Sequence, residues 1–359
     1  MAAKVIKIDK SQWRDRFDQI MSGYRVIAPK KTEEGNYEFQ PLREGEAPEL
    51  DLFNTRLSPK FVTFPQTEVI LKFSTDDKDP DCNLMKEVDP ACPPTAVVGI
   101  RPCDARAMTL VRLNFDTPEY KDPYWLQRYE ATVFIGLACD TPLSTCFCTS
   151  AGGGPYNEEG LDIILAERED YLLAKVLTEK GQTFITTAGF EDEAGDAGEF
   201  ESGRKAAEEK ITSSINTGQL AAKDLLELYE APFWDEIAFA CINCGTCTYL
   251  CPTCWCFDIQ DENYGKRGVR IRNWDSCMYP LFTKHTTGHN PRGEKTQRVR
   301  QRFMHKLKYF VDKYEQGIMC TGCGRCVRQC PVNIDIRAVC EMMNNYQPDP
   351  QSAQAGETT

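Results

Sequence analysis

The sequence lacks the features that mark several large classes of protein. Its first residues, MAAKVIKIDKSQWRDRF, contain no apolar stretch like that of a signal peptide, and no run approaches the length needed to cross a bilayer. The net charge of −12 argues against nucleic acid as a main partner, because phosphate binding needs a basic surface. We therefore expect a cytoplasmic protein with no nucleic acid partner and no direct membrane insertion.

The common motifs of catalysis are missing as well. No G-x-G-x-x-G follows a predicted strand, no phosphate-binding loop is present, and no nucleophile stands with a histidine in a convincing context. No pair of carboxylates suggests acid–base chemistry. We therefore assign no catalytic residue from the sequence.

What the chain has in abundance is cysteine, with 18 residues that mostly fall in tight clusters. A disulfide framework would suit a small secreted domain rather than a long chain without a secretion signal. Repeated C-x-x-C spacing in a cytosolic protein indicates metal binding instead.

One short internal repeat carries the strongest signal. The pattern C-x2-C-x2-C-x3-C-P occurs twice, starting at Cys241 and at Cys320, and each copy has a glycine directly after its second cysteine. Three cysteines of such a run wrap one [4Fe-4S] cluster, while the fourth lies beyond reach and ligates the other cluster. A pair of zinc sites is the competing interpretation, but zinc sites rarely use this four-cysteine run.

The repeat therefore predicts two [4Fe-4S] clusters that exchange their fourth ligands. The expected ligands are Cys241, Cys244, Cys247 and Cys330 for the first cluster, and Cys320, Cys323, Cys326 and Cys251 for the second. The two runs lie far apart for a compact bacterial ferredoxin, and residues 300–314 between them have apolar side chains at helical spacing. This spacing predicts a helical two-cluster ferredoxin domain.

A second constellation lies nearer the N-terminus and consists of Cys103, Cys139, Cys146 and Cys148. The first two follow predicted strand ends, where open α/β sheets place ligand-binding loops. Four cysteines on adjacent loops predict a third [4Fe-4S] cluster, with four reduced thiols as the alternative. The glycine run 152–154 could instead approach a flavin phosphate.

Six further cysteines lie outside these sets. Cys254, Cys256 and Cys277 are either buried walls of the cluster pocket or ligands of another group, and Cys340 is expected to serve packing. We expect no ligand among the remaining pair, Cys82 and Cys92, which lie in a loop rich in proline and aspartate.

The segment 284–308 between the runs is basic and holds all three histidines. It either supplies counter-charge to anionic clusters or docks an acidic partner. Its cationic residues are Lys284, Arg292, Lys295, Arg298, Arg300, Arg302, Lys306 and Lys308.

The pattern along the chain predicts an α+β protein, in which an N-terminal α/β-type domain precedes the helical ferredoxin domain. Residues 97–100 and 132–137 are apolar runs that predict buried strands, with a helix over 105–115 between them. Residues 162–178 have helical spacing, although 170–173 fit a strand equally well. A further helix is expected from about 223 to the first cysteine run.

The acidic stretch 190–222, rich in alanine and glycine, is typical of a linker or a solvated helix. We expect an N-terminal α/β domain over 1–185, an acidic linker or helix over 186–225, a helical ferredoxin domain with two clusters over 226–345, and a loose tail over 346–359.

Several of these segments together resemble one known family. They are residues 99–104 (GIRPCD), 139–148 with the terminal C-F-C, 251–258 (CPTCWCFD), 274–277 (WDSC), 290–292 (NPR) and the final cysteine run. They resemble the family that contains the beta subunit of cytoplasmic sulfhydrogenases and the corresponding iron–sulfur subunit of anaerobic sulfite reductase. The resemblance covers about residues 60–345.

The resemblance implies an electron-relay role. Subunits of this family stand between an FAD-containing subunit that reacts with NAD(P)H and a catalytic redox subunit, which is a hydrogenase, a sulfite reductase or a heterodisulfide reductase. We therefore expect both kinds of partner in an enzyme of anaerobic metabolism, with FAD on a partner. The alternative is a flavin-binding oxidoreductase subunit with its own active site, like the flavin-bearing beta subunits of some hydrogenases.

Overall fold

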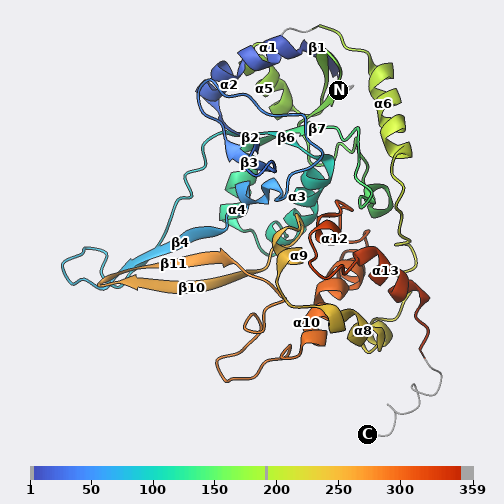
Figure 1. The fold of residues 1–359 in the computed structure, drawn as a ribbon. Helices are drawn as coiled ribbons and strands as arrows, with labels where there is room; N and C mark the ends of the chain where they lie inside the picture. The colour runs from blue at the N-terminus through green and yellow to red at the C-terminus, as the bar shows by residue number, and fades with distance from the viewer. Residues whose placement is uncertain (1–3, 191–192, 349–359) are drawn as a thin grey trace. The chain divides into compact units, whose positions relative to one another are not determined.

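The computed structural model describes residues 4–190 and 193–348, and these residues form two compact units (Figure 1). Each unit is assembled from separate stretches of the chain. Unit 1 contains residues 4–143, 153–190, 193–210 and 252–275, and unit 2 contains residues 144–152, 211–251 and 276–348. The fold class is α+β as predicted, with a sheet-rich N-terminal region and a C-terminal helical region that holds both cysteine runs.

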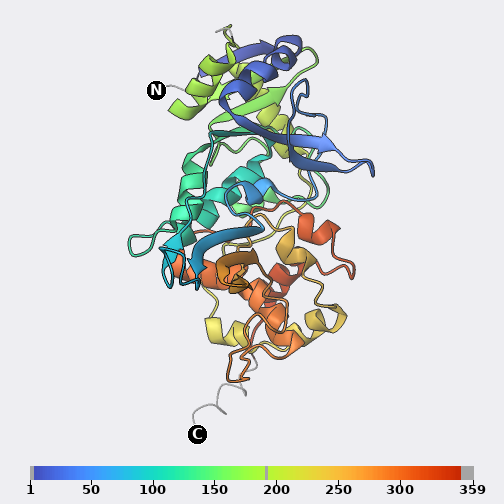
Figure 2. The same cartoon turned by 90° about the vertical axis from the view of Figure 1, so that its left-hand side faces the viewer.

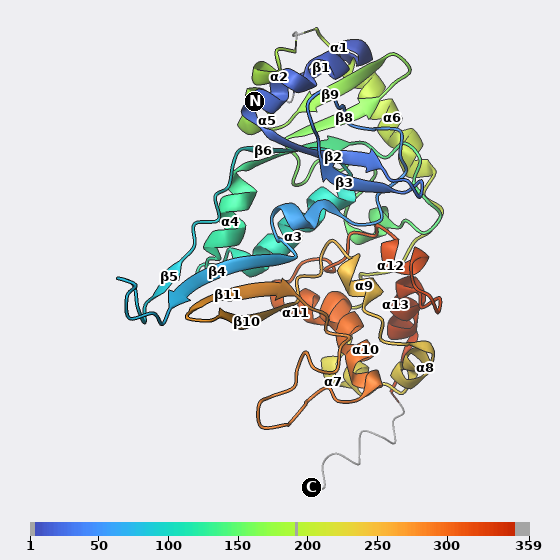
Figure 3. The ribbon, with the colours of Figure 1, turned by 60° about the vertical axis from the view of Figure 1, so that its left-hand side comes forward.

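Unit 1 is built on a seven-stranded sheet with the order β1-β9-β8-β7-β6-β2-β3 (Figure 3). The central strands β8, β7, β6 and β2 pair in parallel, whereas β1, β9 and β3 join at the edges as antiparallel strands. The bounds are Lys4–Asp9 (β1), Arg25–Lys31 (β2), Tyr37–Pro41 (β3), Thr95–Ile100 (β6), Thr132–Leu137 (β7), Ile163–Glu167 (β8) and Tyr171–Val176 (β9).

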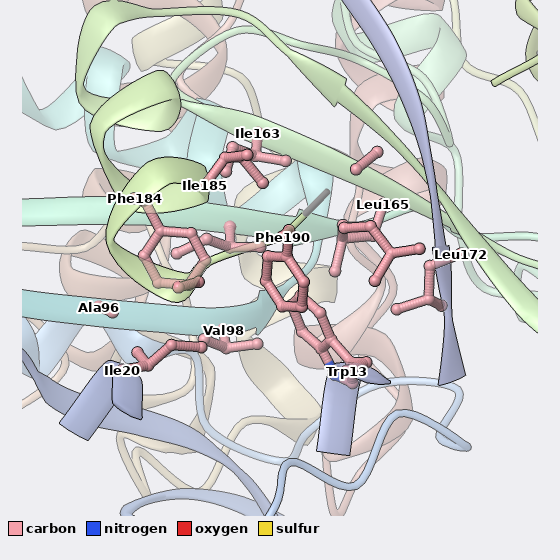
Figure 4. Close-up of a cluster of buried hydrophobic side chains, with 14 of the residues drawn as sticks. Trp13, Ile20, Ala96, Val98, Ile163, Leu165, Leu172, Phe184, Ile185 and Phe190 are labelled. Carbon is pink, nitrogen blue, oxygen red and sulfur yellow. The ribbon is translucent and has the colours of Figure 1, made fainter. Parts of the chain in front are cut away.

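Helices cover both faces of this sheet, so its central strands are apolar on both sides. Every residue of β6 and of β7 is buried. On one face lie α1 (Lys10–Asp15), α2 (Phe17–Gly23) and α5 (Glu179–Ala188) (Figure 2). Their apolar side chains pack against those of the strands (Figure 4). On the other face lie α3 (Pro102–Phe115) and α6 (Ala197–Glu209), the latter within the predicted acidic segment. The helix α4 (Pro123–Glu130) precedes β7.

The helix considered over 162–178 is wrong, because these residues form the antiparallel strands β8 and β9. Successive side chains of both strands alternate between the two buried faces of the sheet, as Ile163 and Ile164 do. A strand that is buried on both faces reads as a continuous apolar run, and this run imitates helical spacing.

A second sheet of unit 1 has four antiparallel strands in the order β10-β11-β4-β5 and extends as an arm (Figure 1). Its bounds are Thr67–Ser74 (β4), Met85–Glu87 (β5), Phe257–Tyr264 (β10) and Arg267–Trp274 (β11). The buried Arg272 anchors the arm, because its Nε donates to Glu68 Oε1 at 2.8 Å and its Nη1 bonds to Asp122. Segment 252–275 therefore leaves the cysteine-rich region to complete unit 1.

Unit 2 is helical. The helix predicted over 300–314 is present, as a continuous stretch formed by α10, one π-helical turn and α11. The single helix expected from about 223 is instead two helices, α7 and α8, because Pro232 lies between them. The bounds are Leu225–Tyr229 (α7), Phe233–Ala240 (α8), Thr246–Tyr249 (α9), Lys295–Met304 (α10), His305–Tyr309 (π turn), Phe310–Tyr314 (α11), Arg325–Arg328 (α12) and Ile336–Asn345 (α13), with short 3-10 turns elsewhere at Pro59–Val62 and Cys148–Ala151.

In the stretches 4–190 and 193–348, no helix is both long and apolar enough to cross a bilayer. The predicted domain limits stay a prediction, and most of the predicted loose tail, residues 349–359, lies outside the described residues.

Phe184 offers a test of how much the sheet core of unit 1 contributes to stability. Changing this fully buried residue of α5 to alanine should lower the free energy of unfolding by about 3–5 kcal/mol, through lost burial and a residual cavity. Urea unfolding followed by circular dichroism measures the change. The exposed neighbour Thr183, changed to alanine, should shift the same free energy by less than about 0.5 kcal/mol. Equal losses would contradict this role for Phe184.

Candidate metal centres

The two four-cysteine runs fold in the same way, as their sequence repeat leads one to expect. In each run, a glycine after the second cysteine adopts a left-handed conformation and begins a short helix: Gly245 (φ +73°) before α9 and Gly324 (φ +70°) before α12. The residue before the second cysteine also has positive φ in both runs, although it is Asn243 in one and Gly322 in the other. Each run is thus a tight turn that curls around its own cysteine side chains.

Backbone amides inside these turns approach the cysteine sulfurs. Asn243 N and Gly322 N each donate to the Sγ of the first cysteine of their run at 3.4 Å. Ile334 N donates to Cys330 Sγ at 3.2 Å. Hydrogen bonds of this kind stabilise negative charge on sulfur, which is one way in which a protein tunes a cluster.

A pocket lies at the first run within unit 2. All four cysteines expected around the first cluster line it: Cys241, Cys244, Cys247 and Cys330. Its remaining wall is largely apolar and includes Ile242, Met278, Val299, Phe303 and Val332, together with Cys326 and the side chain of Arg302. Four thiols around an apolar pocket are the donor set that a [4Fe-4S] cluster requires, so these residues fit the group.

The four cysteines expected around the second cluster also lie in unit 2. Cys320, Cys323 and Cys251 are buried, and the charges of Cys251 and Cys326 both act on Cys320. Over residues 4–190 and 193–348, no three or more His, Cys, Asp or Glu side chains are arranged to hold a single metal ion.

Burial makes these thiols hard to ionise. It raises the pKa of Cys320 to about 12 and the pKa of Cys326 to about 11. Burial also raises the pKa of Cys247. Such thiols give up their protons when a cation takes their place, so thiolate formation is coupled to iron binding.

The basic segment 284–308 divides between the interior and the surface. Arg298, Arg302, Lys306 and Lys308 are buried, whereas the loop around Lys284 is exposed. The buried cations suit the predicted role as counter-charge for anionic clusters, and the exposed loop leaves the docking interpretation open. Sequence reasoning did not single out Arg302, although the four-residue spacing of Arg298, Arg302 and Lys306 places all three on one side of the helix.

The four cysteines of the proposed third cluster are divided between the units. Cys103 opens α3 and Cys139 follows β7, so both stand beyond the carboxyl ends of two neighbouring parallel strands of unit 1. Cys146 and Cys148 belong to unit 2, where Phe147 N donates to Gly322 O at 2.9 Å and Cys146 Sγ lies 3.9 Å from Cys323 O. Each pair is therefore brought together within its own unit, and their assembly into one site stays a prediction.

The remaining cysteines are placed as follows. In unit 1, Cys254 and Cys256 precede β10, and Lys60 Nζ donates to Cys254 O at 3.0 Å. In unit 2, Cys277 is buried, and Cys340 is buried in α13 within the main helical core. This position agrees with the packing role expected for Cys340.

Comparison with known proteins adds to this geometry. Residues 240–334 match the 4Fe-4S dicluster domain family. Over 341 residues, which are 92% of this chain and 96% of the relative, the chain is 29% identical to Sulfhydrogenase 2 subunit beta of Pyrococcus furiosus. The chain is a homologue of the sulfhydrogenase beta subunit. No solved structure matches it.

These matches confirm the resemblance seen in the sequence and the presence of a domain for two [4Fe-4S] clusters. The protein is thus an iron–sulfur electron-transfer protein akin to the sulfhydrogenase beta subunit, and its dicluster domain coincides with both cysteine runs.

The exchange of fourth ligands can be tested by removing one cysteine at a time. Changing Cys330 or Cys241 to serine should abolish one electron paramagnetic resonance signal, and changing Cys251 or Cys320 should abolish the other, because each pair serves one cluster. Spectra of the reduced variants, loaded under anaerobic conditions, provide the measurement. If Cys330 and Cys320 instead shared a signal, each run would close its own cluster. Changing Cys340 to serine is the control and should leave both signals intact.

Proposed function

We propose that this protein is the electron-relay subunit of an anaerobic, cytoplasmic oxidoreductase complex of the sulfhydrogenase kind. It would pass electrons between an FAD-containing subunit that reacts with NAD(P)H and a catalytic redox subunit. The relative's name, a sulfhydrogenase subunit, supports assembly with other subunits and favours a hydrogenase as the catalytic module.

The observation that carries this proposal is the proximity of the two cysteine quartets within unit 2. Cys326 of the second run lines the same pocket as Cys241, Cys244 and Cys247 of the first run. On the proposed ligand sets, the backbone also links the quartets, because each run supplies one cysteine to the other. Two redox centres that lie so close together can exchange electrons. When bound, the clusters supply one-electron chemistry.

The two quartets differ in their exposure, which indicates where a partner approaches. Cys244 is exposed and the neighbouring Ile242 is 62% exposed, whereas Cys320, Cys323 and Cys251 are at most 9% exposed. We infer that the first quartet exchanges electrons with a partner subunit on this side of unit 2. An exposed apolar side chain beside this quartet suits a permanent subunit interface, because such interfaces are more apolar than transient ones.

A third [4Fe-4S] cluster, held by Cys103, Cys139, Cys146 and Cys148, is part of the proposal. The support comes from each unit separately. In unit 1, Cys103 and Cys139 follow the carboxyl ends of the paired strands β6 and β7. In unit 2, Cys146 lies beside Cys323 of the second cysteine run. Such a cluster would add a third redox centre to the electron-transfer path.

Flavin content distinguishes the relay from its alternative, an oxidoreductase subunit with its own flavin site. The isolated, cluster-loaded protein should release no flavin on denaturation. Dithionite should bleach its visible absorbance, whereas NADH and NADPH should not, because hydride oxidation needs the flavin of a partner. Stoichiometric flavin together with direct reduction by NADPH would overturn the relay assignment.

Iron analysis tests the third cluster. Fully loaded protein should contain about twelve irons per chain, since three cubes of four irons are expected. Changing Cys146 to serine should remove one cluster signal and about four irons while the other two signals remain. Changing Cys82 to serine is the control and should leave the iron content unchanged. About eight irons in the fully loaded wild type would show that this cluster does not form.

A further inference from the structure

The side chain of Arg302 occupies a distinctive place among the cysteines of unit 2. It projects from α10, is only 5% exposed, and lines the pocket of the first run together with Cys247 and Cys326. These two cysteines come from different runs. On the proposed ligand sets they belong to different clusters, so one guanidinium stands beside ligands of both.

The electrostatic influence of Arg302 reaches both runs. Arg302 lines one pocket together with Cys247 of the first run and Cys326 of the second run, and its side chain is shielded from water. A buried positive charge favours added negative charge on the groups around it, because the interior screens the interaction less than water does.

The two cations one turn away from Arg302 on the same helical stretch make other contacts. Lys306, one turn further along the helix, is also buried, and its Nζ donates to Met319 O at 3.4 Å. Arg298, one turn earlier, is also buried, but its Nη1 donates to the carbonyls of Arg292 and Gly293, and it does not line the pocket.

We propose that the buried positive charge of Arg302 raises the reduction potentials of both [4Fe-4S] clusters. Reduction adds one electron to a site already rich in thiolates and sulfides. A permanent, buried positive charge stabilises that added electron, and the stabilisation is stronger in the interior than in water. Arginine suits this position because it stays protonated even when it is buried.

Because one charge stands beside ligands of both clusters, it raises both potentials together. A cation beside one cluster alone would mainly raise the potential of that cluster and so change the difference between the two. This inference rests on the proposed ligand sets and deepens the relay function.

The test is a redox titration of each cluster by electron paramagnetic resonance in the intact, loaded protein. Changing Arg302 to glutamine should make reduction of both clusters less favourable by about tenfold or more, which corresponds to about 59 mV for one electron. Changing Arg302 to lysine keeps the charge and should restore most of both potentials. Changing Arg298 to glutamine removes an equally buried charge from the same helix and should leave both potentials within a small fraction of that shift.

Several outcomes would overturn the inference. They are unchanged potentials in R302Q, a shift of one cluster alone, or an equal shift in R298Q. If R302Q fails to load iron, R302M replaces it, because a methionine can fill the same apolar wall without charge. Failure of the wild-type chain to form two clusters would instead count against the proposed function, so the two failures are distinguishable.

Discussion

The architecture of unit 2 depends on one requirement of iron–sulfur chemistry. A [4Fe-4S] cluster needs four thiolates, and a tight C-x-x-C-x-x-C turn supplies only three. On the proposed ligand sets, the fourth comes from the other run, and this requires the two runs to lie beside one another. Helix packing brings the runs together: α10, which lies between them, packs along α8, and α12 of the second run packs along α9 of the first run (Figure 1). The pocket that results gathers Cys330 with the first run.

The chain leaves unit 2 twice and returns to it. Residues 153–210 and 252–275 leave unit 2 and return to it, and each excursion is closed by hydrogen bonds inside unit 2. The ends of the first are tied through Ser150, whose Oγ accepts from Ile215 N at 3.2 Å. The ends of the second are tied by a 2.8 Å bond between the hydroxyls of Thr248 and Ser276. Hydrogen bonds between polar side chains and the backbone, or between two side chains, therefore join the ends of unit 2 segments where the chain leaves this unit.

Elements whose sequence signal is local could be predicted from the sequence alone. The cysteine runs, the strands before Cys103 and Cys139, and the helical stretch after Lys295 all follow from spacing over fewer than twenty residues. The arm could not be predicted in this way, because β11 pairs with β4, some two hundred positions earlier in the chain, and such a pairing leaves no periodic trace. The hairpin of β8 and β9 was obscured for a different reason, since burial on both faces removes the alternation that marks a strand.

The buried cations were hidden by a similar ambiguity. Charged residues along a helix are most often a solvated face, and nothing in a single sequence distinguishes an inward arginine from an outward one. The decisive information is which side of α10 faces the cysteines, and that depends on the packing of unit 2. Once the side is known, the spacing becomes informative. Residues four apart rise about 6 Å along a helix, so Arg302 and Lys306 stand one turn apart.

These positions give the two cysteine quartets different surroundings. On the proposed ligand sets, the second quartet has Arg302 near Cys326 and Lys306 near Cys320, and most of its sulfurs are buried. The first quartet has Arg302 near Cys247, while Cys244 faces solvent. Burial disfavours added negative charge, and solvent exposure favours it. The extra cation at the buried quartet and the water at the exposed quartet therefore act in the same direction, so two unlike environments can hold clusters of similar potential.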